Sequence, residues 1–155
     1  MLSFKHEKGK FNYRTVGVAT HNERVLIHRA EADDFWALPG GRVEFGESAS
    51  DALVREFNEE ISVVIRIKRL LWVMENFFEY NGINYHEIAF YFLIDIPDNS
   101  EVLMNNEFMG NEEEIKLIFQ WYPISKLKEI KLYPTLLQSA LINIPEFTQY
   151  IVHRD

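Results

Sequence analysis

The sequence predicts one domain of the α+β or α/β class, built around a mixed β-sheet. Strand-like segments precede, surround and follow a single amphipathic helix, an arrangement that buries a sheet against helices. The turn signal Asn81-Gly82 separates two apolar runs and predicts a hairpin. The chain has 155 residues, 47% of them apolar, and no repeat or linker, so a single domain should span residues 1–155.

The first elements are predicted to be two strands joined by a tight turn. Segments 11–20 and 24–29 are rich in β-branched and aromatic residues, and residues 21–23 between them have the composition of a hairpin turn. A polar loop over residues 31–34 follows. The short apolar piece 36–38 then ends at Pro39-Gly40-Gly41.

The central helix is predicted to begin after Ser48. Asp51 stands three residues later, which resembles a capping box with aspartate in place of glutamate. Ala49, Leu53 and Phe57 recur at intervals of four and form the apolar stripe that faces the core. The helix should end near residue 61 or 62.

The second half of the chain is predicted to be mostly β. Residues 63–78 read as one long strand or two broken ones, and segment 71–79 should pair with segment 85–96 across the Asn81-Gly82 turn. Residues 105–114 form an acidic loop before a strand at 116–122. Pro123 can begin a helical turn, and Pro134 is expected to open a helix that buries Leu136, Leu137, Ala140 and Leu141.

The net charge of −8 is concentrated in two places. Residues 41–63 hold six acids and two bases, and residues 105–114 hold four acids and no base, so each segment carries −4. An acidic protein repels the nucleic-acid backbone, which argues against duplex binding. Two acidic segments that converge on metal ions would instead attract an anionic substrate.

Cysteine usage and hydropathy are typical of a cytoplasmic protein. No apolar run approaches the roughly 18 to 20 residues of a membrane span, and residues 1–10 lack the apolar core of a secretory signal. The absence of cysteine excludes disulfides, thiolate metal sites and cysteine nucleophiles. We therefore expect a cytoplasmic protein without a membrane partner.

Three glutamates on the predicted helix indicate a metal site. Glu56, Glu59 and Glu60 stand at i, i+3 and i+4 and share one face, where like charges repel one another. A divalent cation on that face would remove the repulsion, and such a site points to phosphate chemistry. The alternative, a solvated acidic helix face, would be the better interpretation of these three residues taken alone.

The surrounding residues resemble the Nudix box of the Nudix (MutT-type) hydrolase family. That pattern is G-x5-E-x7-R-E-U-x-E-E-x-G-U, with U a bulky aliphatic residue. The matching residues are Gly41, Glu47, Arg55, Glu56, Glu59, Glu60 and Val63. Phe57 stands in place of an aliphatic residue and Ser62 in place of the box glycine. Ser62 would pay roughly 1 to 2 kcal/mol for a left-handed backbone at that position.

The resemblance implies a mixed sheet sandwiched between helices, with the box as loop-helix-loop. It also implies a hydrolase that cleaves the pyrophosphate linkage of a nucleoside-diphosphate-linked substrate with Mg²⁺ or Mn²⁺. Such a substrate would be a nucleotide sugar, a dinucleotide or a nucleoside triphosphate. Glu56 and Glu60 are the expected metal ligands, Glu59 a third ligand or a water-holding group, and the Gly40 carbonyl a further ligand.

Helical spacing turns Arg55 about 100° from Glu56, and the resemblance implies that it pairs with Glu47 instead. The general base is either a box glutamate or an acid of the late loop, for which Glu113 is the guess. Arg29 and Arg42 are candidates for phosphate contacts. His86 and Glu87 stand at a strand start, where a surface histidine is the expected interpretation.

Other roles also remain open from the sequence. A non-catalytic nucleotide-binding Nudix module that acts as a sensor is the main alternative, with the Ser62 departure as its only support. A purely structural role is weaker still. Homodimers are common in the family, so a homodimer is a further expectation of the resemblance.

Overall fold

The computed structural model describes all 155 residues. A mixed nine-stranded sheet has the strand order β7-β8-β3-β2-β6-β5-β9, with β1 and β4 both paired to β2. The strands are β1 (Ser3–His6), β2 (Gly9–His21), β3 (Arg24–Ala30), β4 (Gly40–Arg42), β5 (Arg66–Tyr80), β6 (Ile83–Asp95), β7 (Glu107–Met109), β8 (Leu117–Pro123) and β9 (Gln149–Arg154). The helices are α1 (Ala49–Ile61) and α2 (Leu137–Ala140), with 3-10 turns η1 (Glu101–Leu103) and η2 (Ile124–Glu129).

Both predicted hairpins are confirmed, and their turn residues explain them. Asn22 and Glu23, which join β2 to β3, have φ of 51° and 62°, and Asn81 and Gly82, which join β5 to β6, have φ of 51° and 77°. Positive φ at both central residues gives the type I′ turn, whose twist matches that of the flanking strands. Because β2 also runs parallel to β6, the sheet is mixed as predicted.

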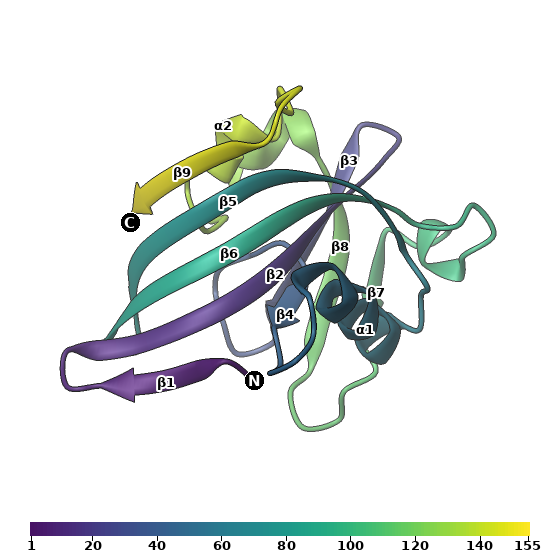
Figure 1. Ribbon diagram of the computed structural model, residues 1–155. Coiled ribbons are helices and arrows are strands. Elements are labelled where there is room, and N and C mark those ends of the chain that lie inside the picture. The colour runs from purple at the N-terminus through teal and green to yellow at the C-terminus, as the bar shows by residue number, and fades with distance from the viewer.

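Helices cover both faces of the sheet. On one face, α1 buries Ala49, Leu53 and Phe57 in a cluster with sheet residues such as Phe92 and Trp121. On the other face, η2, α2 and their flanking segments form a second cluster of the same size against β2, β5 and β6. Figure 1 shows α1 on the side where β4 lies, and α2 close to β9. This layered arrangement is the predicted sandwich.

Several predicted boundaries were wrong for identifiable reasons. Residues 63–65 are not part of a strand; Val63 and Ile65 instead bury their side chains under α1. The acidic loop 105–114 contains the short strand β7, which adds to the edge of β8. The helix after Pro134 has only four residues, and a cis peptide bond joins Tyr133 to Pro134.

Besides β7, three strands were not predicted: β4 and β9 depend on partners far away in sequence, whereas β1 forms a hairpin with the adjacent β2. β1 pairs with β2, β4 pairs with β2 and β9 runs parallel to β5. Their sequences are polar, short or glycine-rich, so no alternation of apolar and polar residues predicts them. No helix in the molecule has the length and apolarity needed to cross a bilayer.

Candidate active site

The box forms a loop and helix that present acidic side chains beside β4. The Ser48 side chain caps α1 by accepting a hydrogen bond from the Asp51 backbone N–H at 3.1 Å, as predicted. The apolar stripe of the helix holds it on the sheet, and the Thr15 hydroxyl donates to the Ala49 carbonyl at 2.8 Å. Glu56 and Glu60 consequently face inward along the edge of the helix, while Asn58 and Glu59 face solvent.

Gly41 lets the β4 backbone approach the acidic edge of α1. A Cβ atom at Gly41 would overlap the carboxyl carbon and both carboxyl oxygens of Glu56. At Gly40 the same addition would overlap the backbone carbonyl of Thr15 in the paired strand β2. The two glycines therefore have different roles. Gly40 permits β4 to pair with β2, and Gly41 leaves room for the Glu56 carboxylate.

Arg55 braces the loop against the helix. Its Nη2 and Nε donate to the two carboxyl oxygens of Glu47 at 2.7 and 3.2 Å, and Nη2 also donates to the Arg42 carbonyl at 3.2 Å. The hydrogen bond from Arg55 holds the pKa of Glu47 below its usual range. This is the pair that the resemblance implies, and bidentate geometry makes it a strong one.

The expectation that Arg55 turns away from Glu56 was wrong. Its Nη1 donates to Glu56 Oε1 at 2.9 Å and to Glu59 Oε2 at 3.3 Å. Helical spacing fixes the direction of Cβ, but the long arginine side chain reaches back over the helix surface. Arg55 thus partly neutralises the acidic face and contacts every box glutamate except Glu60.

Glu60 is the carboxyl without a cationic partner. The residue is 8% exposed and pairs with no lysine, arginine or histidine. Burial, together with the neighbouring Glu56 charge, raises its pKa to about 8. Burial also raises the pKa of Glu56, against the lowering effect of Arg55. Two adjacent acids whose burial resists ionisation are the electrostatic condition that a divalent cation would relieve.

The residues present fit a Mg²⁺ or Mn²⁺ ion in chemistry, although three carboxylates do not converge on one point. Glu56 and Glu60 lie side by side, and they supply the oxygen ligands that hard cations prefer. The Glu59 side chain is 56% exposed and is directed to Arg55. A rotamer change at Glu59 is therefore needed before it can serve as a third ligand.

The acidic loop reaches the site through Asn111. The Asn111 backbone N–H donates to the Glu60 carbonyl at 2.7 Å, and its side-chain amide donates to Ser62 Oγ at 2.8 Å. Ser62 has the left-handed conformation, with φ of 56°, that the box glycine would supply. The hydroxyl of Ser62 thus gives the loop an anchor that glycine cannot.

Among the acids of this loop, Glu112 follows Asn111 directly, and its charge contributes to the raised pKa of Glu60. Glu112, Glu113 and Glu114 are all exposed, and none forms an ion pair. Glu113 as the general base therefore stays a prediction. The position of this loop relative to the helix depends on the Asn111 contacts, which the sequence does not reveal.

The two arginines predicted to touch phosphate have different surroundings. Arg29 donates to the carbonyls of Ala30, Glu31 and Asp33 and lies 5.2 Å over the Trp36 ring, so it organises the loop after β3. Arg42 forms no ion pair; one guanidinium nitrogen lies 3.2 Å from the sulfur of Met1. Of the two, only Arg42 has its charge free beside the box.

Sequence reasoning missed Arg14, which lies opposite Arg42 in the β2–β4 register. Its charge lowers the pKa of Glu56 and Glu60, although burial outweighs it at both. It also acts on Glu87, which is 7% exposed and whose pKa burial raises. Its one hydrogen bond, to the Leu38 carbonyl, is 3.5 Å long. The available signal was the polar alternation of Lys10, Asn12 and Arg14 along β2.

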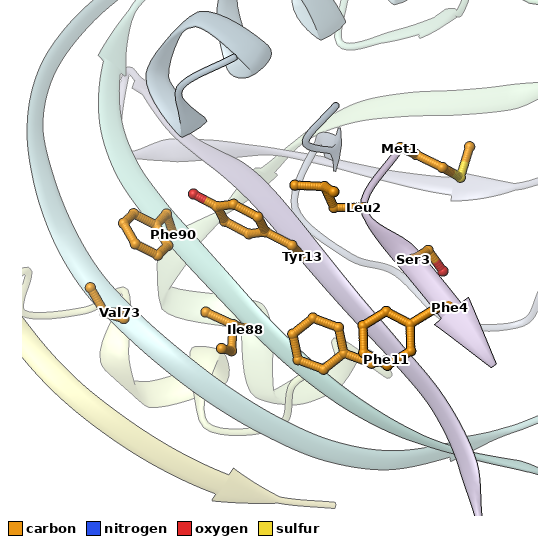
Figure 2. A pocket seen from close by; sticks show the side chains of 9 residues that line it. All are labelled: Met1, Leu2, Ser3, Phe4, Phe11, Tyr13, Val73, Ile88 and Phe90. Atoms are coloured by element: carbon orange, nitrogen blue, oxygen red, sulfur yellow. The ribbon is translucent and has the colours of Figure 1, made fainter. Parts of the chain in front are cut away.

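His86 and an apolar cavity lie on the face of the sheet that also carries α1, at the end of β2 away from the box. His86 is exposed and meets Glu75 at 3.2 Å, which matches the expected surface histidine. The cavity, of about 560 Å³, is lined by Phe4, Phe11, Tyr13 and other apolar residues and is drawn in Figure 2. Neither is part of the acidic site.

Comparison with known proteins places this fold and site in a family. The family model described as a NUDIX domain matches residues 12–139. The chain belongs to the Nudix family. Its Nudix box is the acidic site described above, and the protein is a hydrolase acting on acid anhydrides, of the pyrophosphohydrolase type.

Individual relatives of this Nudix hydrolase differ in what their names say they act on. It is 26% identical over 140 residues to an RNA pyrophosphohydrolase of Ruthia magnifica subsp. Calyptogena magnifica, covering 80% of this chain and 78% of that one. It is 30% identical over 135 residues to diphosphoinositol polyphosphate phosphohydrolase 3-alpha of Mus musculus, covering 81% and 80%. An ADP-ribose pyrophosphatase structure from Streptococcus suis 89-1591 superposes with a TM-score of 0.63 at 15% identity, covering 92% and 98%.

Proposed function

We propose that this Nudix protein uses Mg²⁺ or Mn²⁺ to hydrolyse the pyrophosphate linkage of a nucleoside-diphosphate-linked substrate. The observation that carries the proposal is the pair of the half-buried Glu56 and the buried Glu60, which has no full cationic neutralisation in the folded chain. Bound metal would neutralise charge on the phosphoryl group and lower the pKa of an attacking water. Nucleotide sugars, dinucleotides and nucleoside triphosphates all meet this description.

The protein's own groups divide into three tasks. Glu56 and Glu60 would hold the metal, with Glu59 as a third ligand or water-holding group and the Gly40 carbonyl as a further ligand. The Arg55–Glu47 ion pair holds the loop against the helix, so that Gly41 stays in contact with Glu56. A distortion of about 1 Å at such a site costs roughly 100-fold in rate.

Arg14 and Glu112 complete the proposed site. Arg14 is a phosphate-binding candidate because its guanidinium is paired with no carboxylate by direct contact and its charge already acts on both inner glutamates. Glu112 is the loop acid whose charge acts on Glu60, so it is the candidate to accept a proton from the attacking water. Box glutamate Glu59 is the other candidate base.

A substrate panel with Mg²⁺ tests the proposal. Phosphate or pyrophosphate release would be measured with ADP-ribose, a nucleotide sugar, a dinucleoside polyphosphate and nucleoside triphosphates. Glu60→Gln and Glu56→Gln are each expected to lower kcat by roughly 100-fold, the size seen when one preorganised electrostatic group is removed. Glu44→Gln, an exposed glutamate of the same loop, is the matched control. Turnover of no panel member would overturn the proposal.

The base is tested by a second matched pair. If Glu112 accepts the proton, Glu112→Gln lowers kcat and removes the acidic limb of the pH–rate profile, while Glu113→Gln changes neither. Equal effects of the two substitutions would instead assign the loop a general electrostatic role and leave Glu59 as the base.

A further inference from the structure

Asn111, in the loop between β7 and β8, ties that loop to the last turn of α1. Its backbone N–H donates to the Glu60 carbonyl at 2.7 Å. Its side-chain amide donates to the Glu59 carbonyl at 3.3 Å and to Ser62 Oγ at 2.8 Å, which joins residues 52 and 49 positions apart in the chain. One residue of the acidic segment therefore makes three contacts with the end of the helix that carries the box glutamates.

These contacts reach carbonyl groups for which α1 has no donors of its own. The last four carbonyls of a helix have no N–H partner within that helix. At the C-cap of α1, the Ser62 N–H donates to the Asn58 carbonyl at 3.0 Å, and the last turn contains no basic residue. The carbonyls of Glu59 and Glu60 are therefore capped from outside the helix, by Asn111.

Gly110 lets the loop approach the helix closely enough for these contacts. A Cβ atom at Gly110 would lie 3.0 Å from the Phe119 ring and 3.4 Å from the Glu60 carbonyl oxygen. The first distance is shorter than the separation of about 3.5 to 4.0 Å that carbon atoms prefer. The Gly110 N–H also donates to the Leu117 carbonyl at 2.9 Å, at the start of β8. The loop is thus held between β8 and the end of α1, and Figure 1 shows β7 beside this helix.

Ser62 supplies an acceptor that the glycine of the box pattern lacks. Its backbone is left-handed, with φ of 56° and ψ of 38°, a conformation that favours glycine at a helix end. The hydroxyl oxygen at this position accepts the Asn111 amide. The departure from the family pattern at residue 62 therefore has a partner in a distant loop. This removes the one sequence feature that favoured a non-catalytic module.

The position of Glu60 depends on this end of the helix. Arg55 Nη1 donates to Glu56 Oε1 at 2.9 Å, whereas Glu60 forms no ion pair. The terminal turns of helices fray when their carbonyls lack partners. A metal ligand has to stay within about 0.5 Å of its productive position. A contact that fixes the last turn therefore fixes the one proposed side-chain ligand on α1 that no cation holds.

We propose that Asn111 is a positioning residue for the metal site: it caps the end of α1, holds Glu60 beside Glu56 and keeps the acidic loop next to them. Ser62 is its partner in the place of the box glycine. Groups that orient metal ligands without binding the metal change affinity by roughly 10- to 100-fold when they are removed. The inference rests on the proposed function for the identity of the bound ion, and it concerns metal binding and not the hydrolytic step.

The test measures Mn²⁺ binding to the whole chain by electron paramagnetic resonance. Asn111→Ala is expected to weaken the affinity by roughly 10-fold or more at unchanged stoichiometry. A variant that merely loses folded protein would bind fewer ions at unchanged affinity. Asn106→Ala is the matched control, because Asn106 lies in the same acidic segment but accepts from Arg24 Nη1 at 2.8 Å and contacts no box residue. Equal losses of affinity in the two variants, or no loss for Asn111→Ala, would overturn the inference.

Ser62→Gly tests the same contact from the other side and restores the residue of the box pattern. It removes the Oγ acceptor and should weaken Mn²⁺ binding by no more than about 5-fold, the size of one neutral hydrogen bond. Asn111→Ala made in that background should have a smaller effect than in the wild-type chain, because the two residues share one contact. Strictly additive effects would show that the two residues act separately and would overturn the inference.

Amide hydrogen exchange in EDTA gives a readout without metal or substrate. Asn111→Ala should speed exchange of the Ser62 N–H by at least about 5-fold, because the last turn of α1 opens more readily. The Ala52 N–H, which donates to the Ser48 carbonyl in the first turn, should exchange as before. Unchanged exchange at Ser62 would overturn the inference. Mn²⁺ binding that follows these expectations without turnover of any panel compound would refute only the proposed hydrolysis.

Discussion

Replacing Glu60 by glutamine should stabilise the metal-free protein at alkaline pH. The folded-state pKa of about 8 exceeds the usual 4.5 because Glu60 is buried next to Glu56. An acid with a raised pKa binds its proton more tightly in the folded state, so its favourable contribution is complete at low pH and falls as pH rises from 4.5 to 8. Glutamine keeps the shape and removes the ionisation.

The size of the effect follows from the shift. At about 1.36 kcal/mol per unit, the difference between 4.5 and 8 sets an upper limit near 5 kcal/mol. Side-chain relaxation and coupling to Glu56 reduce this, and we expect on the order of 2 kcal/mol. For a chain of this length that corresponds to a rise in Tm of about 4 to 8 °C.

The assay is thermal unfolding in EDTA at pH 5 and pH 8.5. Glu60→Gln should melt above the wild type at pH 8.5, with most of the gap gone at pH 5. Glu129→Gln, an exposed glutamate of η2, makes the same charge change and should show no pH-dependent gap. Adding Mg²⁺ at pH 8.5 should raise the wild-type Tm and raise that of Glu60→Gln much less. A gap of equal size at both pH values would refute the reasoning.

Three further substitutions test the architecture of the site. Gly41→Ala should leave Tm nearly unchanged but lower kcat by at least about 10-fold. The added methyl group would displace the flexible Glu56 carboxyl group and no backbone atom. Turnover and thermal unfolding of the same variant test this. Ser62→Ala should lower the free energy of urea unfolding by about 1 kcal/mol, because the hydrogen bond from Asn111 is lost. Ser62→Gly should lower it less, because glycine relieves the left-handed backbone strain. The reverse order of the two variants would contradict the strain. Arg55→Lys should cost about 2 kcal/mol and reduce kcat, because an ammonium cannot replace the guanidinium's several contacts.

The local features of the box could be predicted from the sequence because each depends on residues close together in the chain. Ser48 caps the helix it precedes, and Leu53 and Phe57 are buried by helical periodicity alone. The Asn81-Gly82 turn has the positive φ that those residues favour. In each case the physical cause acts within a few residues, so the prediction did not require the rest of the fold.

Features set by contacts between distant segments escaped prediction. β9 forms only because β5 offers it an edge, and Arg14 becomes part of the site only because β2 pairs with β4 and lies near α1. The position of the acidic loop escaped prediction because the Asn111 contacts with Glu60 and Ser62 join residues about fifty positions apart. No periodicity or motif encodes such contacts.

The sequence by itself determined the family pattern, the helix that carries the carboxylates and the concentration of negative charge in two segments. The tertiary structure decided which acids are buried, that Arg55 neutralises Glu56 and Glu59 but leaves Glu60 without a cation, and that Asn111 caps the end of α1. The division has one physical reason. Residue type and helical spacing act locally, whereas burial, ion pairing and the pKa of a carboxyl depend on every group that the fold brings within a few ångströms.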